Sequence, residues 1–445
     1  MAMKRREFIK KASALAASTI VAPYILPSGR LFAASGSQLA PHMVLVMFAG
    51  GVRQQESVLK RYLDDSQGEP YEGNIMYNML NGQVPTQKIV YGTGPGGINP
   101  IPSILGQTIQ SEGTLFAEMQ AVSSGHYQGL NSLIQGSTVT TQGLKQKPLN
   151  PTAFEYLRRH TDAPASKTWF VGNTIGNSVP LMNYSEHPDY GAQYGANFFA
   201  PNVTFGPKGD QYLANAKVYH PEDQLGPIYE MKQFLDNSFE NVGVTPPLLG
   251  NTEEEKQDIK AFMDEMFIKT QAGTIANPPI TDNGDLSTVG YACEVLSWFK
   301  PTLTVVNLSA VDGCHSNFTS YLESLHRADH AVGHLWNHIQ TNVPGMADNT
   351  IMIAVPECGR NDDANAIRDE NDWFAYDHSD LNSLRIFGSM VGPNVQGNLI
   401  VGNENNPVGI ATDIVPTIGE ILGFKSEVMS AGLIDGNAMS LFDRI

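Results

Sequence analysis

The feature that most constrains the fold is an unbroken apolar run at residues 43–48, MVLVMF, which stops at an Ala-Gly-Gly loop. A strand that is apolar at every position buries both of its faces, which is typical of a central strand in a parallel sheet. Two similar runs follow, TLTVVNL at 302–308 and TIMIAV at 350–355. The sequence therefore predicts a sheet that contains these three strands.

Helical patterns lie between and after these runs. Residues 252–255 read T-x-x-E, the form of a capping box, ahead of apolar residues at helical spacing. A longer helix is expected at about 317–342 and another at 412–422. Strands that alternate with helices predict an α/β fold, a doubly wound sheet with helices on both faces.

The first residues predict export. The paired Arg5 and Arg6 lie in a basic start, and a modestly apolar run at 12–26 follows, as in a twin-arginine signal. We expect residues 1–35 to be this signal segment, with a periplasmic destination. Two alternatives remain open: a segment retained as an inner-membrane anchor, although it is short and alanine-rich for a span, and an amphipathic helix of the mature fold.

Residues 36–445, about 410 in number, are enough for one large α/β domain with an insertion. The insertion is expected at about 172–247, which is rich in Asn, Tyr, Gly and Pro and has little periodicity. The formal net charge of −17 argues against nucleic acid as a partner, because phosphate binding relies on clustered Lys and Arg. Membrane contact is expected only if the signal segment is retained.

Acid and imidazole groups follow the predicted strands, where open parallel sheets bind their ligands. Asp312 and His315 come after the second run, Glu357 comes after the third, and His378 lies farther along. Such groups, recurring at strand ends, are what a divalent metal site requires. A hydrogen bond between Asp312 and His315 that only fixes a loop is the simpler alternative.

With these motifs the chain resembles the alkaline phosphatase and sulfatase superfamily, and within it a group of twin-arginine-exported proteins. The D-x-x-H loop at 312–315, E-x-G-R at 357–360, D-H at 377–378 and the closing segment at 411–423 carry the resemblance. It implies a three-layer α/β/α sandwich with a largely parallel central sheet. It also implies a metal centre that acts on phosphate or sulfate esters.

The chain departs from this family's pattern at three places. The first strand ends in Ala49 where active members have a metal-binding Asp, and the nucleophile position, counted back from Gly136, carries His126. The Asp-His pair expected after the third strand is replaced by Glu357-Cys358. We therefore expect one divalent ion, zinc or else calcium or manganese, at Asp312, His315 and His378, with Glu357 or His126 completing the set.

These departures favour a degenerate relative with weak or no ester hydrolysis, which binds a small anionic ligand or a periplasmic protein. The alternative is a metal-dependent hydrolase of phosphate or sulfate esters, in which His126 or a water on the ion attacks. Arg360 is expected to bind an anion or, more simply, to pair with Asp362 or Asp363.

The three cysteines, Cys293, Cys314 and Cys358, are too few for a disulfide scaffold, although an exported protein permits one bridge. Cys314 and Cys358 lie in two of the converging loops. They are candidates for thiolate ligands, for a disulfide with each other, or for small buried apolar side chains.

One further pattern owes nothing to the family: histidines recur every four residues at 326, 330, 334 and 338. On a helix they span an arc of about 120°, nearly opposite the apolar stripe of the same helix. Pairs at this spacing suit a metal or a pH-sensitive contact. A solvated polar face is the simpler expectation.

Overall fold

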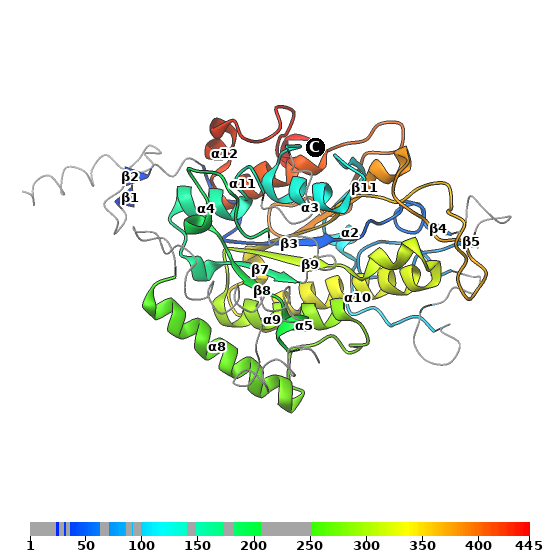
Figure 1. The fold of residues 1–445 in the computed structure, drawn as a ribbon, viewed down its shortest axis with the longest axis horizontal. Helices are drawn as coiled ribbons and strands as arrows, with labels where there is room; N and C mark the ends of the chain where they lie inside the picture. Colours follow the sequence, from blue (N-terminus) through cyan, green and yellow to red (C-terminus); the bar gives the residue numbers. More distant parts are fainter. Residues whose placement is uncertain are drawn as a thin grey trace, which may run out of the picture.

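The three apolar runs form adjacent strands at the centre of an eight-stranded sheet that lies between two layers of helices (Figure 1). This arrangement confirms the predicted α/β/α fold class with a largely parallel sheet. The structure is a computed structural model, and it describes residues 24–25, 31–32, 36–62, 71–85, 91, 99–139, 148–172, 182–205 and 251–445.

The sheet has one strand that runs against the others. From edge to edge its order is β12 (Leu399–Val401), β6 (Thr114–Gln120), β11 (Arg385–Val391), β10 (Thr350–Pro356), β3 (His42–Phe48), β9 (Leu303–Leu308), β7 (Thr168–Gly172) and β8 (Asn197–Phe199). β11 is antiparallel to β10 and β6, whereas the remaining neighbours pair in parallel. In the centre, Leu45 of β3 is in register with Ile353 of β10 and Val305 of β9.

Two short pairs lie outside this sheet: β1 (Tyr24–Ile25) with β2 (Leu31–Phe32), and β4 (Arg61–Tyr62) with β5 (Tyr71–Glu72). The predicted signal segment lies outside the described residues except for β1 and β2. Of the predicted insertion at 172–247, only 172 and 182–205 are described, and this part supplies the edge strand β8.

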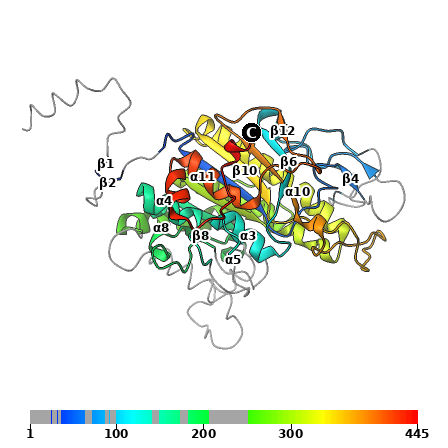
Figure 2. The ribbon, with the colours of Figure 1, turned by 90° about the horizontal axis from the view of Figure 1, so that it is seen from above.

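The helices form two layers. They are α2 (Ile109–Glu112), α3 (His126–Gln135), α4 (Ala153–Thr161), α5 (Pro201–Thr204), α8 (Glu253–Ala272), α9 (Gly284–Phe299), α10 (Phe318–Asn342), α11 (Ile414–Leu422) and α12 (Lys425–Ala431). In Figure 1, α3, α4, α11 and α12 lie above the sheet, and α5, α8, α9 and α10 lie below it. Seen from above, α11 lies over the central strands (Figure 2).

β3 explains why an all-apolar run is needed at the centre. Its residues alternate between two cores: Leu45 and Met47 pack with α3, α4 and α11, whereas Val46 and Phe48 pack with α9 and α10. Side chains on a strand point alternately to its two faces, so a strand covered on both sides buries every position. Burial stabilises by about 1.5–3 kcal/mol for each large apolar side chain.

The predicted helices are confirmed, with their caps. Thr252 and Glu255 form the capping box of α8, in which each side chain accepts from the other's backbone N–H. Asn317 caps α10 by accepting from the backbone N–H of Ser320. None of the helices in the described ranges is long and apolar enough to cross a membrane.

The expectation of a solvated histidine face on α10 is wrong. His326, His330 and His338 are only 1%, 3% and 8% exposed. The polar face of α10 is covered by segments distant in sequence: His326 contacts the backbone at Ile75 and Ile101, and His338 contacts α9. Helical periodicity does not report such coverage.

Candidate metal centre

Four segments meet at one edge of the sheet because of its topology. The short helix η3 (Ala310–His315) follows β9 and carries Asp312 and His315, and residues 357–360 follow β10. The loop with His378 precedes β11, and because β11 is antiparallel its amino end lies at the edge where β10 ends. α3, which begins at His126, follows β6.

Glycines let these segments approach closely. Gly50, just after β3, has a φ of +121°, and a Cβ there would lie 2.5 Å from the backbone N of Asp312. In α3, a Cβ at Gly129 would lie 2.7 Å from the carbonyl O of Glu357. Atoms do not approach so closely without a shift, so both positions need glycine for the site to assemble.

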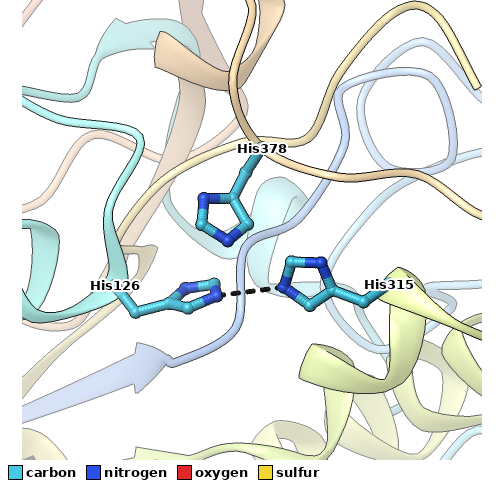
Figure 3. Close-up of side chains that lie close together, drawn as sticks. All are labelled: His126, His315 and His378. Carbon is cyan, nitrogen blue, oxygen red and sulfur yellow. Dashed lines mark hydrogen bonds between the residues drawn. The ribbon is translucent and has the colours of Figure 1, made fainter. Parts of the chain in front are cut away.

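The structure brings together three of the predicted side chains as a group of imidazoles. His126, His315 and His378 each offer a ring nitrogen, and these nitrogens lie within 4.8 Å of one another. Figure 3 shows the three rings pointing toward a common space from three different segments. The His378 ring centroid lies 4.1 Å from that of His126 and 4.7 Å from that of His315.

Hydrogen bonds fix the orientation of two of these rings. His126 Nδ1 lies 2.6 Å from Glu357 Oε1, and His315 Nδ1 lies 2.8 Å from Asp377 Oδ1. A carboxylate only accepts, so each Nδ1 carries the proton and donates. The Nε2 atoms then face each other across 3.4 Å.

Asp312 completes this arrangement. Its Oδ1 lies 3.1 Å from His126 Nε2, 3.4 Å from His315 Nε2 and 3.0 Å from Arg360 Nη2. Ligand atoms about 2.0–2.1 Å from a tetrahedral zinc ion are separated by about 3.3 Å. The separations among the two Nε2 atoms and Oδ1 therefore fit the edges of such a polyhedron.

Glu357 lies behind His126 instead of facing the shared space. It is fully buried, and its Oε1 also accepts from the backbone N of Gly50 at 2.6 Å. Burial raises the pKa of this carboxyl, against the opposing effect of His126. Its Oε2 has no hydrogen-bond partner among the described residues. The geometry gives Glu357 the position of a residue that orients a ligand, although it also belongs to a second candidate group with His126 and Cys358.

Burial and neighbouring charges shift the pKa values of three side chains in the site. Burial lowers the pKa of His126, but its hydrogen bonds to Asp312, Cys358 and Glu357 outweigh this and raise the pKa to about 12. Burial alone would raise the pKa of Asp312, yet the bonds to His126 and His315 hold it well below its usual range. Burial, with the charges of His126 and Arg360, lowers the pKa of His378 to about 4.

Arg360 pairs with a different acid from the two that the sequence suggested. Its Nη2 contacts Asp312 Oδ1 and the carbonyl O of Gly50, and it is fully buried. Asp362 instead accepts from Gln55 Nε2 at 2.7 Å. The predicted pairing was wrong because the loop turns Arg360 back under the strand ends.

The three cysteines are free and buried, so the suggested disulfide between Cys314 and Cys358 does not form. Cys314 is part of the apolar core, where burial raises the pKa of its thiol to about 12. Cys358 Sγ lies 3.9 Å from His126 Nδ1.

Two features of the site bear on catalysis. Both ring nitrogens of His126, the residue at the predicted nucleophile position, face partners in the site. In the described part of the chain, none of the three imidazoles hydrogen-bonds a serine or threonine hydroxyl. Asp377 belongs to the D-H motif at 377–378 that the sequence indicated, but it was not predicted as a site residue, and the structure places it on His315 instead of on an ion.

No protein-family model matches the chain, and no curated protein matches it in sequence. Among solved structures, an alkaline phosphatase superfamily protein from Vibrio parahaemolyticus is 11% identical, with a TM-score of 0.37, over 95% of this chain and 76% of that one. The lipoteichoic acid synthase LtaP from Listeria monocytogenes is 11% identical, with a TM-score of 0.37, over 95% and 78%. An alkaline phosphatase from the Antarctic bacterium TAB5 is 12% identical, with a TM-score of 0.40, over 86% of this chain and 99% of that one. The structural neighbours of the chain thus include members of the alkaline phosphatase superfamily, and at these TM-scores the likeness assigns no activity.

Proposed function

We propose that this chain is an exported alkaline-phosphatase-type protein that holds one divalent ion through His126, Asp312, His315 and His378. There it binds a small anionic ligand, with little or no ester hydrolysis. The observation that carries the proposal is the pair of imidazoles whose Nδ1 atoms are tied to carboxylates while their Nε2 atoms converge with Asp312 Oδ1.

This pairing supports a metal ion because metal-ligating histidines nearly always donate their other N–H to a carboxylate or carbonyl. Glu357 and Asp377 supply those acceptors here. Nitrogen donors favour zinc over calcium, which prefers oxygen ligands, so zinc is the expected ion. When bound, the ion supplies a Lewis acid and a positive charge that attracts an anion.

The proposal of weak hydrolysis rests on the groups that surround the ion. Covalent ester hydrolysis in the family that the chain resembles uses a hydroxyl-type nucleophile, and Ala49 and His126 stand where that family's metal-binding Asp and nucleophile are expected. His126 is in addition held on both sides, by Glu357 and Asp312. An imidazole so constrained is a ligand or an ion-pair partner, not a free nucleophile.

The test is a titration of the purified mature chain with zinc, manganese and calcium, paired with turnover of phosphate and sulfate monoesters. We expect Asp312→Asn and His315→Ala each to bind one zinc ion fewer than the wild type. We expect little or no hydrolysis of the monoesters by any of these proteins with any of the three metals. Asp362→Asn is the matched control, since Asp362 lies in the adjoining loop but contacts no imidazole, and it should leave binding unchanged. Robust turnover that disappears in Asp312→Asn would replace the binding role with the hydrolase.

Export is proposed from the sequence, in keeping with the twin-arginine-exported group that the chain resembles. Replacing Arg5 and Arg6 with lysine should leave precursor in the cytoplasm, because the transport route reads the paired arginines. Cell fractionation measures this directly. An unchanged periplasmic yield of the double variant would contradict the proposal.

A further inference from the structure

A second group of metal-ligating side chains lies in the helix layer below the sheet. Cys293 on α9 and His334 and His338 on α10 each offer one ligand atom, and these atoms lie within 4.8 Å of one another. We infer that Cys293, His334 and His338 form a zinc site that ties α9 to α10. His338 lies about 30 Å along the axis of α10 from its first turn, at 1.5 Å per residue, so this site is separate from the centre at the sheet edge.

The spacing of the two histidines suits a shared ion. Residues four apart on a helix lie on the same side one turn apart, and the two ring centroids are 6.3 Å apart. Cys293 faces them from the neighbouring helix and is fully buried. Imidazole and thiolate groups are both zinc ligands, and three protein ligands leave the fourth position of a tetrahedral zinc ion open to water.

Hydrogen bonds set the same nitrogen of both rings as the proton donor. His334 Nε2 lies 2.9 Å from the carbonyl O of Ala276, which can only accept. His338 Nε2 lies 2.9 Å from Ser297 Oγ, whose own proton goes to the carbonyl O of Cys293 at 2.8 Å. Both Nε2 atoms therefore donate, and in each neutral ring the lone pair falls on Nδ1.

This is the arrangement that ligating histidines show, in which a carbonyl or hydroxyl holds the far nitrogen and fixes the ring. Burial lowers the pKa of His338 to about 4 and lowers that of His334 as well. Burial also raises the pKa of the Cys293 thiol, and zinc would displace its proton.

The surroundings hold the outer partners in place. Glu294 Oε1 accepts from the backbone N of Ala276 at 2.9 Å, and its Oε2 pairs with Lys269 of α8 at 2.7 Å. A Cβ at Gly290 would lie 2.0 Å from Asn277 Oδ1, so this glycine lets the same loop lie against α9. The carbonyl that orients His334 is thus fixed before any ion binds.

Cobalt substitution of the purified mature chain tests the inference, because a thiolate on Co²⁺ gives a charge-transfer absorption that imidazole and carboxylate ligands lack. We expect this absorption in the wild type and its loss in Cys293→Ser, together with one equivalent of bound metal. Cys358→Ser is the matched control, a buried cysteine beside the first centre, and should keep the absorption. Asp312→Asn should also keep it, which separates this site from the proposed function.

Ser297→Ala tests the orientation of His338 without removing a ligand. It should weaken cobalt binding at this site about 10- to 100-fold, with an unchanged circular dichroism spectrum. Zinc should raise the midpoint temperature of thermal unfolding of the Asp312→Asn variant. It should not raise the midpoint temperature of the double variant that also carries Cys293→Ser. A charge-transfer absorption absent from the wild type at saturating cobalt, or one that persists in Cys293→Ser, would overturn the inference.

Discussion

His326 shows how a single buried histidine is held neutral. Its Nδ1 donates to the carbonyl O of Ile75 at 2.7 Å, and its Nε2 accepts from the backbone N of Ile101 at 2.9 Å. A second proton would therefore point at an N–H donor. Burial is the main cause that lowers the pKa of this ring to about 4, and the nearby Arg327 and His330 add to it.

We predict that His326 makes the fold sensitive to acid. Between about pH 6.5 and pH 4 the unfolded chain binds a proton at this position and the folded chain does not. The free energy of unfolding should then fall as the pH falls, by about 1.4 kcal/mol per pH unit from this residue. The difference in the free energy of unfolding between the wild type and His326→Gln should therefore become smaller as the pH falls. NMR spectra of the folded protein in which the His326 imidazole titrates near pH 6.5 would contradict this prediction.

At this scale the sequence predicts which residues meet but not how they face. Asp312, His315 and His378 could be expected together because strand ends share one edge of a sheet. The position of Glu357 behind His126 could not, because it depends on how closely α3 approaches at Gly129. The acid that pairs with Arg360 likewise depends on the path of a loop.

Among the elements, α3 is the one whose placement the site depends on most. Ala at position 129 would favour the helix by about 1 kcal/mol over Gly, but its Cβ would meet the Glu357 carbonyl at 2.7 Å. We predict that Gly129→Ala destabilises the fold by about 1–3 kcal/mol, as overpacking does, and weakens zinc binding by displacing His126.

Denaturant unfolding and zinc titration measure the two effects together. Gly436→Ala is the control, since a Cβ there meets nothing within 4 Å among the described residues. It should leave zinc binding unchanged and should not lower the free energy of unfolding. A more stable Gly129→Ala with intact zinc binding would show that α3 does not need this close approach.

Elements buried on both faces were the ones that the sequence predicted well. β3, β9 and β10 read as apolar runs because each is covered by helices above and below. β6 and β11 lack such an unbroken apolar run, since Glu118 lies within β6 and Arg385 begins β11, and these two side chains pair with each other at 2.7 Å. The histidine face of α10 was predicted wrongly for a related reason. The segments that cover this face are distant in sequence, so the periodicity of α10 alone does not reveal them.

For the whole molecule, the fold explains how one chain gathers ligands from four segments. The largely parallel sheet directs β9 and β10 to one edge, the antiparallel β11 brings the His378 loop there, and β6 leads into α3. The net charge of −17 is therefore compatible with an anionic ligand only if a local cation draws it in. Arg360 and His126 both pair with Asp312, and the proposed ion would supply a further positive charge.

The most direct test that His126, His315 and Asp312 bind a zinc ion is an anomalous difference map at the zinc edge, from crystals of the zinc-loaded protein. We predict a peak at the sheet edge, about 2.0–2.1 Å from the Nε2 atoms of His126 and His315 and bonded to Asp312. The Nδ1 atoms of His126 and His315 should keep their hydrogen bonds to Glu357 and Asp377. A map with no peak there, and with His126 still hydrogen-bonded directly to Asp312 and Glu357, would rule out a metal ion at this site and leave the cluster as an ion-pair network.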